Sequence, residues 1–194
     1  MRKIVAGLLI SLDGVVEAPD KWHFPYFNDE MGAAIGASIG EGDCMLLGRV
    51  TYEEFAGFWP NQSPDDPFTG IMNNTPKYVV STTLNQLDWQ NSTLINGNNL
   101  VEEITKLKNQ PGKNINITGS GTLVRSLLRE GLLDELTLFL HPIVVGTGKR
   151  LFPEGYEQTP LKLANSSTFS TGVLNLTYVP AGTEGELASS GGQR

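Results

Sequence analysis

The stretch Ile117 to Thr122 (ITGSGT) decides the fold class of this chain, because it sets a glycine-rich turn directly after an apolar, strand-like run. Two other segments have the same form: Gly48 to Glu53 (GRVTYE) follows Met45–Leu47, and Ser81-Thr82 follows Val79-Val80. An open α/β sheet binds nucleotides at turns of this kind, where its strands end. The sequence therefore predicts an α/β fold with a ligand site at one edge of the sheet.

Length and composition are those of one domain. The chain has 194 residues, of which 39% are hydrophobic and 18% charged, enough to bury a substantial core. We predict a single domain over residues 1–180. A flexible tail over residues 181–194 is expected to follow, because that segment has almost no large apolar residue to offset the entropy of ordering it.

Charge and cysteine content restrict the partners and the compartment. The net charge is −7 and no cluster of Lys and Arg occurs, which excludes a typical nucleic-acid surface. The apolar run Ile4–Ile10 is too short to span a membrane and lacks a signal-cleavage site, so it predicts the first core strand. The one cysteine, Cys44, is expected to be a buried hydrophobe, and the chain to be cytoplasmic. We expect no metal site.

Apolar runs with strand character alternate with helical stretches, at Ile4–Ser11, Met45–Leu47, Tyr78–Ser81, Thr93–Ile95 and Ile115–Thr118. Such alternation predicts βαβ units and a largely parallel sheet. About four helices are expected, over residues 29–39, 50–59, 99–109 and 122–129, the third capped by the Asn99 side chain. Residues 61–76 predict a surface loop or a poorly formed short helix.

The pattern changes after Gly131. Three strand-like runs follow without a helix between them, at Glu135–Ile143, Leu161–Phe169 and Val173–Val179. Only three residues separate the last two runs, which favours antiparallel pairing. The predicted sheet is therefore mixed, parallel in its centre with an antiparallel C-terminal edge.

The turns have the chemistry of an anion site. Backbone N–H groups of the turn from Thr118 to Thr122 lie at a helix start and can face an anion, although a simple tight turn has the same sequence. Arg49 also lies at a helix start, where its charge is slightly unfavourable unless an anion is bound; a solvated surface arginine is the alternative. Hydroxyls at Ser81, Thr82 and Thr83 suit a ribose phosphate.

These segments and several others occur in a fixed order, and together they resemble a known family. The carriers are Ser11 to Gly14 (SLDG), Gly48 to Glu53, Gly119 to Thr122 (GSGT), Asp134 to Leu136 (DEL), and Pro142 to Gly148 (PIVVGTG) with Leu151-Phe152. Over residues 2–179 the chain resembles the dihydrofolate-reductase-like superfamily, and within it the group similar to the C-terminal reductase domain of bacterial riboflavin biosynthesis enzymes. The resemblance implies NADPH as reductant and a homodimer built on the C-terminal strands.

The resemblance also implies where the cofactor lies. Arg49 and Thr51 would contact its phosphate, and a guanidinium suits the extra phosphate of NADPH. Ser81 and Thr82 would lie at the adenosine ribose, the glycine turn at the pyrophosphate, and the main chain of the first strand near the nicotinamide. The full set of expected contacts is Ala6, Gly7, Gly48, Arg49, Val50, Thr51, Ser81, Thr82, Thr83, Gly119, Ser120, Gly121 and Thr122.

The substrate half is expected under the long aromatic segment from Leu12 to Phe27, which would form a lid. Candidate substrate contacts are Trp22, Phe24, Tyr26 and Trp59. Candidate proton donors are Asp13, Asp29 and His23; their structural alternatives are a turn residue, a helix-start carboxylate and a surface loop residue. The pattern around Asp29 does not match that of folate reductases.

Hydride transfer from NADPH to a small heterocyclic (pterin- or pyrimidine-like) or carbonyl/imine compound is the function these features favour. The alternative is a non-catalytic NADP(H)-binding dimer that has kept the cofactor turns and lost its chemistry.

Overall fold

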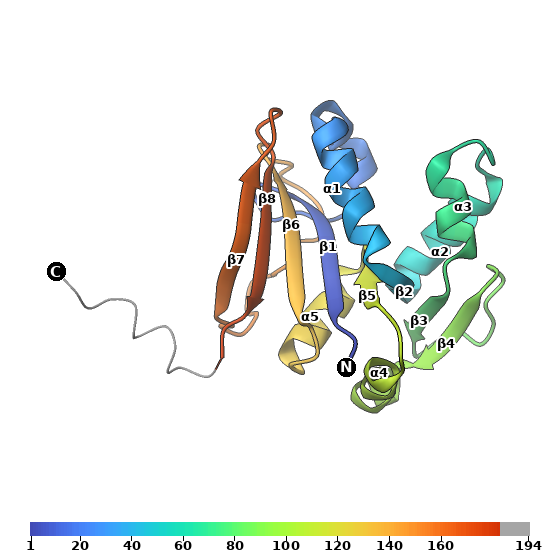
Figure 1. Ribbon diagram of the computed structural model, residues 1–194. Coiled ribbons are helices and arrows are strands. Elements are labelled where there is room, and N and C mark those ends of the chain that lie inside the picture. The colour runs from blue at the N-terminus through green and yellow to red at the C-terminus, as the bar shows by residue number, and fades with distance from the viewer. Residues whose placement is uncertain (183–194) are drawn as a thin grey trace.

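Helices cover both faces of an eight-stranded sheet in the computed structural model, which describes residues 1–182 (Figure 1). The strands are β1 Ile4–Ser11, β2 Gly42–Gly48, β3 Lys77–Ser81, β4 Ser92–Asn96, β5 Asn114–Ile117, β6 Glu135–His141, β7 Leu161–Thr168 and β8 Leu174–Pro180. The helices are α1 Asp29–Gly40, α2 Arg49–Phe58, α3 Pro67–Asn74, α4 Leu100–Asn109 and α5 Gly121–Arg129. Short 3-10 turns lie at Pro19–Lys21, Phe24–Tyr26, Trp59–Asn61 and Gly97–Asn99.

The strand order is β4-β3-β2-β5-β1-β6-β8-β7. All pairs from β4 to β6 are parallel, whereas β8 runs antiparallel to β6 and β7 antiparallel to β8. This confirms the predicted mixed sheet with an antiparallel C-terminal edge. It also places the carboxyl ends of the six parallel strands along one edge, where the predicted turns lie.

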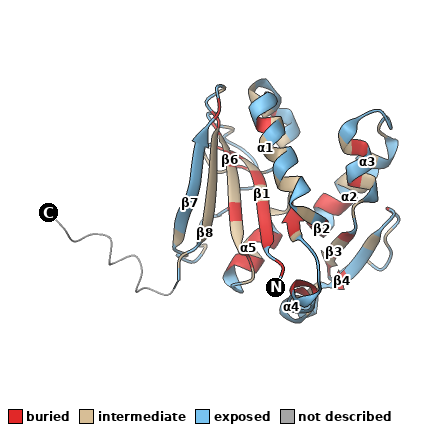
Figure 2. Cartoon of the chain, viewed as in Figure 1, coloured by how far each residue is buried: buried red, intermediate tan, exposed pale blue. Residues whose placement is uncertain are grey.

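Alternation along the strands divides the core between the two faces. Ile4, Ala6 and Leu8 of β1 pack in one cluster with apolar residues of α4 and α5, and this central strand is almost entirely buried (Figure 2). Met45 and Leu47 of β2 face the other way and pack with Tyr52 of α2 and Met72 of α3. The sheet therefore separates two hydrophobic cores, and a different set of helices packs on each face.

Residues 67–74 form a regular helix, where the sequence predicted a surface loop or a poorly formed short helix, and the described residues contain five α-helices. Asp66 accepts hydrogen bonds from the amides of Phe68 (2.7 Å) and Thr69 (3.3 Å) and caps the start of α3. Lys77, only 1% exposed, donates to three carbonyl oxygens at the end of α3, including that of Met72 at 2.9 Å. A capping residue ten positions after the helix start carries no local sequence signal, which is why the sequence did not decide between a loop and a short helix here.

Two further expectations, on Asn99 and Cys44, have clear outcomes. Asn99 precedes α4 but its side chain caps nothing; the side chain of Asn96 instead accepts from the amide of Asn98 (3.0 Å) in the preceding turn. Cys44 is buried as predicted, and burial raises the pKa of its thiol to about 11. Most of the tail expected at 181–194 lies outside the described residues. Within residues 1–182, no helix is long and apolar enough to cross a membrane.

Candidate cofactor and substrate site

The turns predicted to bind an anion lie where the connections of the sheet diverge. β2 and β5 are parallel neighbours. From β2 the chain passes through α2 to β3 on one side, whereas from β5 it passes through α5 to β6, beyond β1 on the other side. Helices leaving neighbouring strands in opposite directions open a crevice between their first turns, and such crevices are where α/β sheets bind ligands.

The two turns approach each other closely because glycine stands in each. A Cβ at Gly48 would lie 2.6 Å from the Ser120 hydroxyl oxygen, and a Cβ at Gly119 would lie 3.0 Å from the Thr51 methyl carbon. Both separations are shorter than an ordinary van der Waals contact. The turns that the sequence predicted to converge therefore do converge, and a side chain at Gly48 would force the neighbouring turn to shift.

The amides at the start of α2 have no side-chain cap. Gly48 is the N-cap residue and carries no hydrogen-bonding side chain, and the first turn of α2 contains no acidic residue. In contrast, α1, α3 and α5 are capped by Asn28, Asp66 and Ser120. The first amides of a helix remain unsatisfied without a cap and attract negative charge. α2 therefore offers the crevice a set of open donors.

Ser120 has an unusual backbone. Its φ is 83°, a left-handed value that non-glycine residues seldom adopt, and its hydroxyl accepts from the amide of Leu123 at 3.3 Å. Such conformations cost free energy and occur mostly where function or packing requires them. Thr122, in the first turn of α5, is followed one turn later by Ser126, whose hydroxyl donates to the Thr122 carbonyl at 3.1 Å.

Arg49 is at the crevice but is not a free cation. Its guanidinium pairs with Glu53 on the next turn of α2 at 2.7 Å, and both side chains are about half exposed. An exposed pair at this spacing is worth only about 0.3–0.5 kcal/mol, so a phosphate can displace it. The sequence interpretation weighed an anion against a solvated surface arginine and did not consider the pair with Glu53. Val50, next in α2, is also exposed.

The hydroxyl of Ser81 is engaged in its own turn. Ser81 is buried, and its oxygen accepts from the amides of Thr83 (3.1 Å) and Leu84 (3.0 Å). Thr82 and Thr83 are exposed and are the hydroxyls that β3 presents at its end. Thr82 lies against the turn after β4, because a Cβ at Gly97 would lie 2.9 Å from its methyl carbon.

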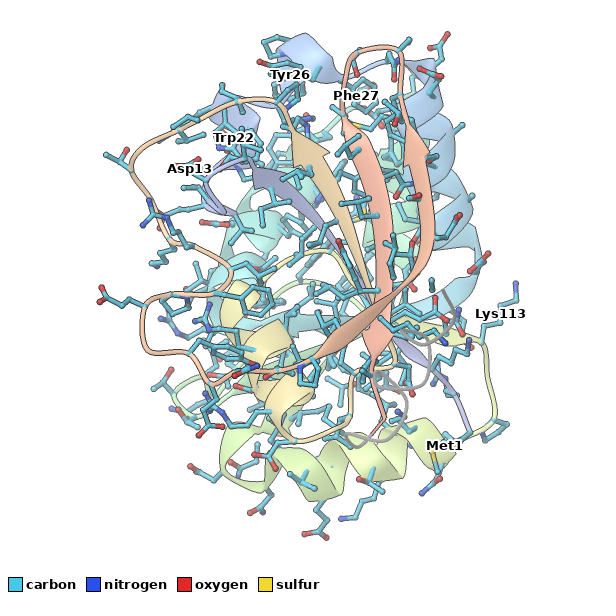
Figure 3. The ribbon with its side chains drawn as sticks, turned by 90° about the vertical axis from the view of Figure 1, so that its left-hand side faces the viewer. Met1, Asp13, Trp22, Tyr26, Phe27 and Lys113 are labelled. Atoms are coloured by element: carbon cyan, nitrogen blue, oxygen red, sulfur yellow. The ribbon has the colours of Figure 1, made fainter. Side chains whose placement is uncertain are left out.

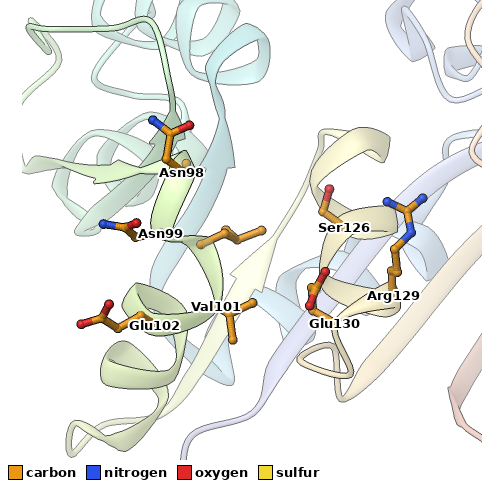
Figure 4. Close-up of a pocket in the computed structure, with 9 residues that line it drawn as sticks. Asn98, Asn99, Val101, Glu102, Ser126, Arg129 and Glu130 are labelled. Atoms are coloured by element: carbon orange, nitrogen blue, oxygen red, sulfur yellow. The ribbon is translucent and has the colours of Figure 1, made fainter.

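An open groove lies between α4 and α5, with a volume of about 460 Å³ (Figure 4). One wall is residues 97–102, next to Thr82, and the other includes Ser126, Arg129 and Glu130. The sequence interpretation missed this groove. Its only signal was the helical spacing of Ser126 and Arg129, four and seven positions after Thr122.

Ala6 and Gly7 lie in the middle of β1. Ala6 is level with Ile117 of β5, two residues before Gly119, and also pairs with Leu136 of β6. Ala6 is buried on the α4–α5 side of the sheet. Gly7 occupies the other face, where a Cβ would be 4.0 Å from the ring of Phe139.

Asp13 ties together the two loops that follow β1 and β6. Its carboxylate accepts hydrogen bonds from the Ser11 hydroxyl (2.7 Å) and from the amides of Val145 (3.0 Å) and Gly146 (2.9 Å). These bonds favour the charged form and lower its pKa to about 2. An ionised carboxylate has no proton to give at neutral pH. The geometry therefore supports the turn-residue alternative for Asp13 and not the proton donor.

His23, Trp22 and Tyr26 of the long loop form an aromatic cluster around His141. Trp22, Tyr26 and Asp13 are labelled in Figure 3. The ring of His141 is fully buried, with its centroid 5.2 Å from Trp22, 5.7 Å from Tyr26 and 6.1 Å from His23, each approaching edge to face. Burial lowers the pKa of both histidines. His23 is thus half-buried in a cluster and is not the surface residue that its alternative supposed.

The expected substrate contacts separate into different environments. Trp22 is buried against His141, its indole N–H donating to the Glu17 carbonyl at 3.2 Å, whereas Phe24 is exposed. Trp59 packs with Phe55 beside the core cluster that α2 and α3 share. Trp22 and Trp59 therefore contribute to packing, and the structure does not bring the four predicted side chains together.

The start of α1 carries two carboxylates with different surroundings. Asp29 is exposed in the first turn of α1, which agrees with its structural alternative, a helix-start carboxylate. Glu30, which the sequence interpretation did not select, accepts from the amide (2.7 Å) and hydroxyl (2.6 Å) of Ser170 in the β7–β8 turn. These bonds lower the pKa of Glu30 and fix α1 to the antiparallel edge.

Comparison with known proteins agrees with this arrangement. The family model of the RibD C-terminal domain matches residues 2–175. Two proteins of Bacillus subtilis (strain 168) are similar over nearly their whole length: the uncharacterized protein YyaP is 33% identical over 91% of this chain and 94% of its own, and the uncharacterized protein YwjB is 28% identical over 93% and 99%.

Solved structures show the same fold. A putative riboflavin biosynthesis protein from Shewanella sp. PV-4 has a TM-score of 0.75 at 23% identity, covering 94% of this chain and 100% of its own. Dihydrofolate reductase from Enterococcus faecalis, complexed with NADP(H), has a TM-score of 0.62 at 17% identity, covering 93% and 97%. The fold is therefore dihydrofolate-reductase-like, and the chain belongs to the RibD C-terminal domain family.

Proposed function

We propose that this protein is an NADPH-dependent reductase that transfers a hydride to a small heterocyclic or carbonyl/imine compound. One observation carries the proposal: two glycine turns, one followed by an uncapped helix start, meet at the point where the connections of the sheet diverge. Main-chain N–H groups of two turns that are too close together for an added Cβ form a suitable binding site for a pyrophosphate. The family supports the same class of reaction.

Different residues of this chain would bind different parts of the cofactor. The amides of Gly48 to Thr51 and of Gly119 to Thr122 would hold the phosphates, and Arg49 would exchange Glu53 for the additional phosphate of NADPH. The groove between α4 and α5 would receive the adenosine end, because its wall at residues 97–102 lies next to Thr82 at the end of β3. When bound, the cofactor supplies the hydride; the protein supplies orientation and exclusion of water.

The loop over residues 12–27 would exclude water from the reacting atoms. Asp13 serves this role indirectly, because its hydrogen bonds from the amides of Val145 and Gly146 hold the loop to the segment after β6. It is a positioning residue. The proposal retains the expected homodimer through the C-terminal strands and the expected cytoplasmic location.

The specific observation that favours the alternative, a non-catalytic NADP(H)-binding dimer, is the state of the predicted proton donors. Asp13 is ionised and already accepts three hydrogen bonds, and His23 lies in a buried cluster where protonation is disfavoured. Of the three predicted proton donors, only Asp29 would then be able to protonate a hydride acceptor that needs a proton from the protein.

Two measurements test the proposal. A ligand that binds only the native state at a hundred times its Kd stabilises it by about 2.7 kcal/mol, so saturating NADPH should raise the melting temperature by roughly 5–10 °C. Stopped-flow absorbance should then show oxidation of bound NADPH with at least one of a panel of pterins, pyrimidines and quinones. Protection without oxidation would favour the non-catalytic alternative, and absence of protection would refute both.

A further inference from the structure

A second cavity, of about 280 Å³, lies on the opposite face of the sheet from the α4–α5 groove. It is enclosed by α1 and α3 and floored by β2 and β5, and its lining residues are Gly36, Ile39, Gly40, Gly42, Met45, Phe68, Ile71, Met72, Thr75, Asn116 and Thr118. Thr118 directly precedes Gly119 of the cofactor turn. The cavity therefore begins beside the proposed cofactor site.

No charged side chain lines this cavity. Ile39, Met45, Phe68, Ile71 and Met72 give it apolar walls. Transferring an unpaired anion from water into such surroundings is costly, because nothing replaces its hydration. An uncharged occupant meets no such cost, and it gains from burial of its apolar surface.

Asn116 is held in the wall by the end of α1. The residue is only 7% exposed, and its Nδ2 donates to the carbonyl oxygens of Ser38 (3.1 Å) and Ile39 (3.3 Å) at the end of α1. Because both partners are acceptors, the amide orientation is determined. Its Oδ1 and the hydroxyl oxygen of Thr118 lie beneath the surface of the wall, out of reach of an occupant, and accept nothing from the described residues. The accessible lining is therefore uncharged and mostly apolar.

We propose that this cavity receives the hydride acceptor, and that the acceptor is an uncharged ring compound without a phosphate. The inference rests on the proposed function for the identity of the occupant as a substrate. The cavity itself depends on α1, whose Gly36 and Gly40 leave open space where side chains would otherwise stand.

Methionine methyl groups report occupancy directly. The chain has four methionines; Met45 and Met72 line the cavity, whereas Met1 is exposed and Met31 packs against Phe139 on another part of the sheet. The protein with ¹³C-methyl methionine is titrated with two matched pairs, in the presence and absence of NADPH: hydroxymethyldihydropterin and its diphosphate ester, and uridine and uridine monophosphate. At least one uncharged probe should shift Met45 and Met72 and leave Met1 and Met31 in place, with its phosphorylated partner at least tenfold weaker.

A pair of glycine variants locates the binding. Gly36→Leu fills the cavity from α1, and Gly70→Leu places the same side chain on α3, outside the lining. A Cβ has open space at both positions, and leucine favours a helix over glycine, so neither variant should melt below the wild type. Gly36→Leu should weaken the uncharged probe at least tenfold, and Gly70→Leu should not.

The outcomes separate this inference from the proposed function. If both uncharged probes leave Met45 and Met72 unshifted, if a phosphorylated probe binds as well as its partner, or if Gly36→Leu binds normally, the inference is overturned while NADPH protection stands unaffected. If the probe binds as expected but NADPH gives no protection, the cavity is a ligand site and the reductase proposal fails.

Discussion

The two halves of the proposed site are formed by different parts of the chain, main-chain groups in one half and side chains in the other. The cofactor half is mostly main chain: Gly48 and Gly119 allow the turns after β2 and β5 to meet, and the amides of α2 are open. The substrate half consists of side chains from α1, α3, β2 and β5, and of the long loop whose aromatic residues pack around His141. One half is specified by short local segments, the other by contacts between distant ones.

Substitution at Gly48 has the largest expected effect, and it falls on the cofactor half alone. Gly48→Ala places a Cβ 2.6 Å from the Ser120 hydroxyl, which must displace one turn from the other. We expect NADPH affinity, measured by calorimetry, to fall about a hundredfold, or roughly 2.7 kcal/mol.

Gly57→Ala is the matched control, because it lies in the same helix with open space around its Cβ. Binding by Gly57→Ala should equal that of the wild type. A Gly48→Ala protein with normal affinity would show that close approach of the turns is not what binds the cofactor.

Loss of the Lys77 ammonium should affect the substrate half first. Lys77→Met removes three hydrogen bonds to the last carbonyls of α3, a wall of the second cavity. We expect the free energy of unfolding to fall by about 2 kcal/mol. The melting temperature should fall by roughly 4–8 °C.

In the same Lys77→Met protein, shifts of Met45 and Met72 with the uncharged probe should weaken while NADPH affinity changes little. Equal losses of both would mean that the two halves are not energetically separate.

The sequence predicted the sheet and its two converging turns far better than the contacts around the long loop, for a physical reason. A strand followed by a glycine turn and a helix is a local pattern, so the segments at Gly48 and Gly119, the mixed sheet and its antiparallel edge could all be predicted. The α3 cap by Lys77, the Glu30–Ser170 contact and the cluster around His141 join residues remote in sequence. No spacing rule gives such contacts, and Asp13 and Trp22 were assigned to chemistry for that reason.

The Arg49 side chain should have a smaller effect that depends on the cofactor. Arg49→Ala removes a charge that already has a partner in Glu53 at 2.7 Å, so we expect NADPH to bind about tenfold more weakly and NADH to be nearly unchanged. Glu53→Gln releases the guanidinium and should tighten NADPH slightly. A similar loss for both cofactors in Arg49→Ala would show that Arg49 does not contact the additional phosphate.

The histidine cluster should give the smallest effect, seen in stability against pH. Burial lowers the pKa of His23 and His141 below 6.5, so between the lowered values and 6.5 the unfolded chain binds more protons than the native protein. Stability is therefore greatest above pH 6.5 and declines as the pH falls below it. Urea unfolding at pH 7.5 and 5.5 should show a smaller decline for His141→Phe than for the wild type; an unchanged decline would place its origin elsewhere.

The most direct test of the central claim, that main-chain amides of two converging turns hold one dinucleotide, is an amide NMR titration of the ¹⁵N-labelled protein with NADPH. The amides of Gly48 to Thr51 and of Gly119 to Thr122 are predicted to shift together, with one shared Kd. Shifts confined to a single turn, or two sets with different Kd values, would contradict the account.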